Sequence, residues 1–233
     1  MKFVKAFIIL FLINLSLDIY FHNTKGLHEF RIFTKPIITL SLAIYFYVNS
    51  YALQMRKRLI IVGALLLLCI ADIFLLETTS FYSLMSALSL SLVAILFYSL
   101  YFYKQTHYDI DRLIPFLAVS LLICLAVFYL MYEKLDKMLI PVMIYMATIL
   151  NFLKIAYLRY KSVSLQSYRL VFIGVAFFTI TQIIIGLSKF YKTLPFEDLY
   201  IMLFYGISQL LIIFGILVMI HSDEKLTEDP LLY

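Results

Sequence analysis

The sequence has few of the residues that cover the surface of a water-soluble protein. Asp, Glu, Lys and Arg make up only 14% of its 233 residues, whereas a soluble domain has about a quarter. This small share excludes a water-soluble fold. The six glycines and five prolines argue against the broken helices typical of transporters. The two cysteines, Cys69 and Cys124, both lie in apolar runs, which supports neither a disulfide framework nor a cysteine-ligated metal site.

The sequence is instead rich in long apolar runs, with 64% hydrophobic residues and a mean hydropathy of +0.98. Each run is long enough to cross a hydrocarbon core of about 30 Å as a helix, and none alternates as a barrel strand does. We therefore predict an all-α polytopic membrane bundle with eight transmembrane helices, forming a single domain over residues 1–233. The predicted spans lie near residues 3–20, 36–53, 58–76, 81–103, 112–132, 138–158, 168–188 and 198–220.

The basic residues are divided unevenly between the two sides of such a bundle. Twelve of the 19 Lys and Arg, including Lys2, share the side of the N-terminus, and seven, including Lys25, lie on the other side. Because bases are retained on the cytoplasmic face, both termini are predicted to be cytoplasmic. The bases lie at the ends of spans and form no patch interleaved with aromatic residues, so we predict no binding of nucleic acid.

Two carboxylates, Asp72 and Asp18, fall at membrane depth. A charge in the middle of a span costs about 2.5 to 3.5 kcal/mol, so a retained one needs a partner or a purpose. Lys35, expected in the first turn of the second span before Pro36, lies at the same level, and an Asp–Lys cluster is predicted in the non-cytoplasmic half. For Asp72 a functional role and a purely interhelical contact both stay open. For Asp18, near the interface, the structural interpretation is favoured.

Uncharged polar residues recur on the later spans, where they either join helices by hydrogen bonds or line a pocket. Those singled out are Tyr145, Asn151, Gln182, Tyr205 and Gln209. We expect Lys35, Asp72, Gln182 and Gln209 to converge on one cavity. The histidines lie in loops or at span ends, where hydration is the simpler interpretation, so neither a metal site nor a cofactor is predicted. They are His22, His28, His107 and His221.

Seven short segments follow one another in the order typical of one family. They are LSLD (15–18), KPIITL (35–40), ADIFLL (71–76), FYSLYF (97–102), PVMIYM (141–146), GVAFFTITQ (174–182) and YGISQLLIIFG (205–215). Together they resemble the YhhN family of lysoplasmalogenase-like integral membrane proteins. The resemblance implies hydrolysis of the vinyl-ether bond of a lysoplasmalogen to a fatty aldehyde and a glycerophospho-alcohol, with a membrane lysophospholipid as the ligand.

The resemblance also implies roles for particular residues. Vinyl ethers are hydrolysed by protonation of the carbon β to the oxygen, followed by capture of water, which needs a carboxylic acid that an apolar site keeps protonated. Asp72 is the implied acid, and Lys35 its electrostatic partner or a phosphate anchor. The resemblance further implies Tyr98, Tyr145 and Gln209 as pocket residues. Together with four residues from the polar pattern alone, Asp18, Asn151, Gln182 and Tyr205, they are the predicted substrate-binding residues.

The sequence departs from the family pattern at three positions. Ala71 replaces a glycine, Ile95 stands where a histidine would align, and Gln182 stands where a second acid is common. Glutamine can orient water, but it neither donates nor accepts a catalytic proton at neutral pH. Two alternatives to a hydrolase therefore stay open. One is a non-enzymatic lipid-binding or small-solute transport bundle, and the other is a family member that keeps the fold without the activity.

Overall fold

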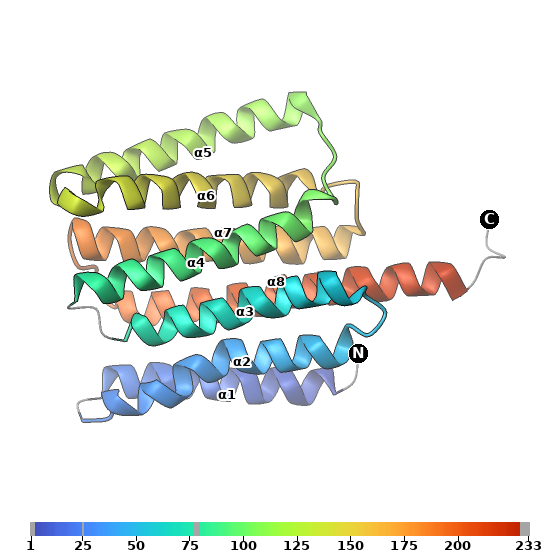
Figure 1. Cartoon of the computed structure of the whole chain (residues 1–233), viewed down its shortest axis with the longest axis horizontal. Helices are drawn as coiled ribbons and strands as arrows, with labels where there is room; N and C mark the ends of the chain where they lie inside the picture. The colour runs from blue at the N-terminus through green and yellow to red at the C-terminus, as the bar shows by residue number, and fades with distance from the viewer. Residues whose placement is uncertain (1–2, 25, 77–79, 229–233) are drawn as a thin grey trace.

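The computed structural model describes residues 3–24, 26–76 and 80–228, with side chains through Ser222, as helices aligned along one axis (Figure 1). The helices are α1 (Val4–Asn23), α2 (Arg31–Asn49), α3 (Met55–Phe74), α4 (Phe81–Tyr103), α5 (Ile110–Met131), α6 (Leu139–Leu158), α7 (Leu165–Phe190) and α8 (Glu197–Glu228). Three 3-10 turns, η1 (His28–Phe30), η2 (Tyr132–Lys134) and η3 (Asp136–Met138), lie in the connections. The described residues include no strand, which confirms the all-α prediction. Lys2 and Lys25, used above to predict orientation, lie outside the described residues.

Seven of the described helices are long and apolar enough to cross a membrane, which is consistent with an integral membrane protein. The remaining helix, α3, does not meet this criterion because Lys57, Arg58 and Asp72 lie in every 18-residue stretch of its 20 residues. It nevertheless packs against α2 on one side and α4 on the other, and runs alongside both (Figure 1). Composition thus supports seven of the eight predicted spans.

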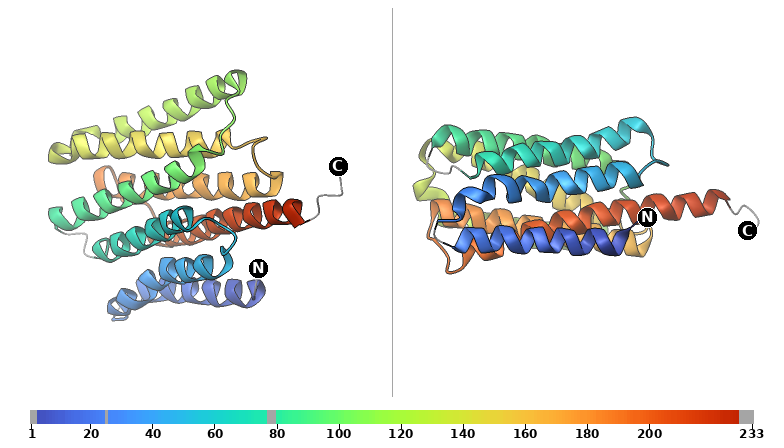
Figure 2. Two further views of the ribbon diagram at one scale, coloured as in Figure 1. Left: turned by 45° about the vertical axis from the view of Figure 1, so that its right-hand side comes forward. Right: turned by 90° about the horizontal axis from the view of Figure 1, so that it is seen from below.

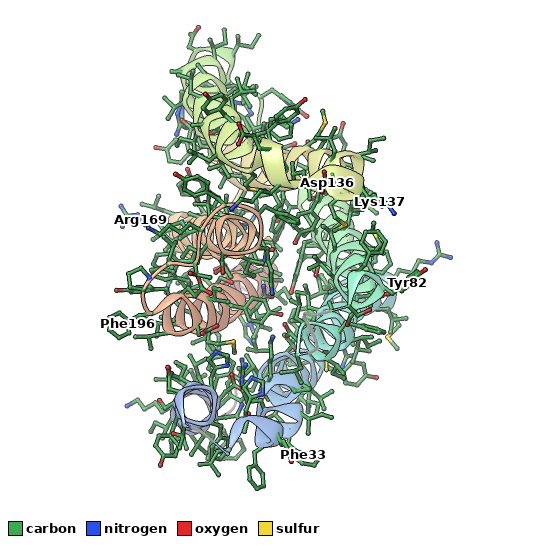
Figure 3. All side chains as sticks on the ribbon, turned by 90° about the vertical axis from the view of Figure 1, so that its left-hand side faces the viewer. Phe33, Tyr82, Asp136, Lys137, Arg169 and Phe196 are labelled. Carbon is green, nitrogen blue, oxygen red and sulfur yellow. The ribbon has the colours of Figure 1, made fainter. Side chains whose placement is uncertain are left out.

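The described helices are arranged as a ring with one helix outside it. Viewed along the bundle, the contacts follow the order α1, α2, α3, α4, α6, α7 and α8, and α8 closes the ring against α1 (Figure 3). α5 packs on the outside of α6 and α7, and only Met131 at its end is buried. α8, with 32 residues, is the longest helix, and its C-terminal end projects beyond its neighbours (Figure 2).

The beginning of α2 differs from its predicted position. The helix starts at Arg31, so Lys35 and Pro36 lie in its second turn rather than its first. The expectation that Pro36 marks the first turn is therefore wrong. The preceding turn is held in place because the side chains of Arg31 and Thr34 both bind Asp18 on α1. A proline inside a helix removes one backbone hydrogen bond, and these contacts anchor the turn that precedes Pro36.

Two glycines allow α7 and α8 to pack closely. A Cβ atom on Gly174 would lie 2.9 Å from the carbonyl oxygen of Ser208, and one on Gly215 would lie 2.6 Å from Cγ2 of Val171. Both separations are shorter than the contacts that real Cβ atoms make, so any side chain would push the helices apart. The α7–α8 pair forms one wall of the ring.

Candidate functional site

A polar cavity of about 180 Å³ lies inside the ring, at the end of the bundle opposite the N-terminus of α1. Its lining comes from α1, α2, α3, α4, α7 and α8, and Figure 3 looks onto this end. Lys35, Asp72 and Gln182, three of the four residues expected to converge, line it together with Tyr205. Helices far apart in the sequence therefore bring their polar side chains to one place.

Asp72 lies near the end of α3 and is only 4% exposed. Its Oδ2 accepts a hydrogen bond of 2.8 Å from the hydroxyl group of Tyr205 on α8. The carboxyl group thus borders the cavity and also joins two helices across the ring. Because it faces inward, it avoids the cost of a charge exposed to lipid.

Lys35 enters the same cavity from α2 and is 7% exposed. Its ammonium group makes no hydrogen bond or close ion pair with any residue that the structure describes, and its main attractive electrostatic interaction is with Asp72 in the same cavity. A buried cation is stable only when paired or hydrogen-bonded. Lys35 is therefore available to an anionic group that enters the cavity.

A chain of charged side chains ties α1, α2 and α8 together at the mouth of this cavity. Fully buried Asp18 accepts a hydrogen bond of 2.6 Å from Oγ1 of Thr34 and lies 3.4 Å from Nη2 of Arg31. Arg31 also contacts Nδ1 of His22, and Nε2 of His22 lies 2.8 Å from Oδ2 of Asp198. Asp18 supports the wall and is not among the residues that line the cavity.

The sequence analysis missed three members of this chain, Arg31, His22 and Asp198. The expectation that His22 is simply hydrated is wrong, because its side chain is 17% exposed and pairs with charged groups on both sides. The spacing of these residues along the sequence could have indicated the cluster. Asp18 and His22 are four residues apart on α1, and Arg31 and Lys35 are four residues apart on α2, so each pair shares one helix face.

A second cavity, of about 360 Å³, adjoins the polar one between α4, α5, α6 and α7. Its lining is mostly aliphatic, with side chains such as Val142, Met146 and Ile183. Five residues line both cavities, and the polar ones bring a hydroxyl, an amide and an ammonium group to the shared wall. They are Leu75, Ser91, Gln182, Ile185 and Lys189.

Four predicted residues remain, and none of them lines the polar cavity. Tyr145 lines the apolar cavity and donates a hydrogen bond of 2.9 Å to Oε1 of Gln182. Tyr98 donates one of 3.2 Å to Oε1 of Gln209. Both partners of this second pair are buried, and neither lines either cavity. The expectation that Gln209 joins Asp72 is therefore wrong, and half-buried Asn151 on α6 also lines neither cavity.

With this geometry established, comparison with known proteins identifies the family. The sequence model of the YhhN family matches residues 30–216. The chain belongs to the YhhN family. The resemblance carried by the seven short segments is thereby confirmed. Comparison with functionally curated proteins and with solved structures gave no match.

The three residues expected to depart from the family pattern occupy two kinds of environment. Ala71 and Ile95 are each 1% exposed, and Ile95 belongs to the main hydrophobic core. Gln182 instead lies in the wall between the two cavities. In this YhhN protein Gln182 therefore brings an amide to the polar cavity that Asp72 also lines.

Proposed function

We propose that this YhhN-family protein hydrolyses the vinyl-ether bond of a lysoplasmalogen in the membrane, with Asp72 as the proton donor. The observation that carries the proposal is the wall shared by a polar and an apolar cavity. A lysoplasmalogen has one hydrocarbon chain, joined through a vinyl ether to a polar glycerophospho headgroup. With the chain in the apolar cavity and the headgroup in the polar one, the vinyl ether lies at the junction.

The reaction needs one carboxyl group used twice. Asp72 donates its proton to the carbon β to the ether oxygen, and the electrons of the double bond form the new C–H bond. The positive charge is then shared by the neighbouring carbon and the ether oxygen. Water adds to that carbon while the Asp72 carboxylate accepts the released proton. Asp72 then donates that proton to the ether oxygen as the C–O bond of the hemiacetal breaks, and its carboxylate accepts the hydroxyl proton, which leaves the alcohol, the fatty aldehyde and the restored acid.

Three neighbours of Asp72 support this chemistry. The hydrogen bond from Tyr205 fixes the orientation of the carboxyl group. The Oε1 atom of Gln182 is occupied by Tyr145, which leaves its Nε2 group to hold the attacking water. The unpaired ammonium group of Lys35 binds the phosphate of the headgroup. A single acid suffices in this scheme, so Gln182 can stand where a second acid is common.

We further infer that α3 crosses the membrane as an eighth span and that both termini face the cytoplasm. The packing of α3 between α2 and α4 supports the crossing, as does the position of Asp72 on a cavity wall rather than facing lipid. The unequal division of Lys and Arg supports the orientation. In this arrangement the polar cavity lies toward the non-cytoplasmic side.

A second candidate function is lipid binding without hydrolysis. The observation that favours it is that Ile95 and Gln182 stand where the resemblance implies a histidine and a second acid. The same pair of cavities would then hold a lysolipid that is not cleaved. Transport of a small solute is a weaker version of this candidate, because the helices are continuous through the bundle.

Purified protein mixed with a vinyl-ether lysolipid distinguishes these candidates by the release of fatty aldehyde. We expect release by the wild type and a loss of at least about a hundredfold in Asp72→Asn. Asp111→Asn, which changes an exposed acid in the first turn of α5, should match the wild type. Thermal stabilisation of the wild type by the lysolipid without any aldehyde would contradict hydrolysis and support binding alone.

A further inference from the structure

A third cavity is lined by segments at the opposite end of the bundle, the end at which α1 begins (Figure 1 shows where these segments lie). Its volume is about 720 Å³. It is lined by the α2–α3 connection, the beginning of α3, the end of α4, the α6–α7 connection and the C-terminal half of α8. No step of the proposed hydrolysis uses this cavity.

The lining of this cavity carries charge of one sign. Arg56 and Lys57 enter it from the first turn of α3, and Lys104 enters from the end of α4. No acidic side chain is among its described lining residues. Grouped cations of this kind favour an anion, and phosphate oxygens are common partners of both arginine and lysine. We call this space the basic cavity.

Arg159 places a further positive charge directly behind the wall of the basic cavity. It is fully buried, and its Nε donates a hydrogen bond of 2.9 Å to Oε1 of Gln105, a lining residue. Its Nη2 lies 3.9 Å from Sδ of Met219, also in the lining.

The charge of Arg159 is not balanced within the part of the chain that the structure describes. Nη1 has no hydrogen-bond partner there, and no carboxylate forms an ion pair with the side chain. Burial lowers the pKa of Arg159 to about 10, which leaves the guanidinium group charged at neutral pH. A buried charge without a counter-ion is costly, so an anion in the basic cavity would be stabilised by it.

We propose that the basic cavity binds a phosphate-bearing anion, through Arg56, Lys57 and Lys104. The phosphate belongs either to a soluble anion or to the headgroup of an anionic lipid in the adjoining leaflet, because both present the same oxygens to these side chains. Arg56, Lys57 and Lys104 are themselves exposed. The site differs from scattered surface bases because the three line one cavity built from five segments, with buried Arg159 behind its wall.

The test compares two variants that remove the same number of positive charges. Arg56→Gln with Lys57→Gln empties one side of the basic cavity. Lys5→Gln with Arg169→Gln removes two exposed bases from the same end of the bundle that do not line the cavity. In one arm, thermal unfolding in a neutral detergent is followed during titration with inorganic phosphate at constant ionic strength. In the other, native mass spectrometry counts the lipids that remain bound after mixing with phosphatidylglycerol or phosphatidylcholine.

A rise in Tm with phosphate in the wild type and the control, with an apparent affinity about tenfold weaker in the cavity variant, identifies a soluble anion. Phosphatidylglycerol retained by the wild type and the control but lost from the cavity variant identifies a lipid headgroup. The proposal is overturned if the two double variants behave alike in both arms, or if the wild type binds neither probe. Lys104→Gln repeats the comparison from the other side of the cavity, should the first variant not fold.

Discussion

Tyr205 and Asp72 join α8 to α3 through a hydrogen bond of 2.8 Å from the tyrosine hydroxyl to Oδ2 of the carboxyl group. Both side chains are buried and both line the polar cavity. Because the hydroxyl donates to Oδ2, Oδ1 stays available to carry a proton and to face a substrate. Tyr205 is therefore a positioning residue for the proposed acid.

Replacement of Tyr205 by phenylalanine should lower kcat about tenfold and leave KM nearly unchanged. The physical reason is the loss of one hydrogen bond, which is worth about 1 to 1.5 kcal/mol, at a group that acts in the transition state. Steady-state kinetics of aldehyde release would measure both constants.

The matched control is Tyr98→Phe. It also removes a buried hydroxyl and its hydrogen bond, the one to Gln209, but at a position outside both cavities. The two variants should lose similar stability, and only Tyr205→Phe should lose kcat. Equal losses of kcat in both would show that the hydroxyl of Tyr205 matters for packing alone.

Replacement of Lys35 by glutamine should raise KM for a phosphate-bearing lysolipid by about tenfold or more, because a hydrogen bond to a charged group is worth about 1.5 to 3 kcal/mol. A 1-alkenyl glycerol, which lacks the phosphate, should be cleaved equally well by the variant and the wild type. Lys137→Gln, at an exposed lysine on the same end of the bundle (Figure 3), is the control. A similar change for both substrates would refute the role of Lys35 as a phosphate anchor.

Asp18 has two predicted roles, a structural contact between helices and substrate binding. Its buried ion pair with Arg31 favours the structural role. Replacement by alanine leaves Arg31 charged without its carboxylate partner, so we expect a loss of about 3 kcal/mol in the free energy of unfolding. Glu133→Ala, at an exposed position in η2, should change stability little. Thermal unfolding provides the measurement. Unchanged stability together with a raised KM would instead support substrate binding by Asp18.

The helices could be predicted from the sequence because the bilayer sets their length. Each described helix overlaps its predicted span, and the inward position of Asp72 follows from the cost of charge in lipid. The sequence also indicated the shared depth of Lys35 and Asp72, since the ends of successive spans alternate between the two faces of a membrane.

The meeting of particular side chains could not be predicted in the same way. Gln209 lies one turn beyond Tyr205 on α8, a step of about 6 Å along the helix, and that step carries it from the polar cavity into contact with Tyr98. The order of helices around the ring determines such contacts, and the hydropathy of the sequence does not predict this order. The apolar cavity was also missed, because an aliphatic side chain beside an empty volume has the same sequence pattern as one in a packed core.

The apolar cavity should set the chain length of the substrate, and Ala176 on α7 tests this because it lines that cavity. Phenylalanine at this position would occupy the space of several methylene groups, each worth about 0.8 kcal/mol when buried. We expect KM for a long-chain vinyl-ether lysolipid to rise about tenfold or more, and KM for a short-chain analogue to stay nearly the same. Ile173→Phe, on the same helix at a side chain 45% exposed, should leave both values unchanged. An equal effect of Ala176→Phe on both chain lengths would mean that the hydrocarbon chain lies elsewhere.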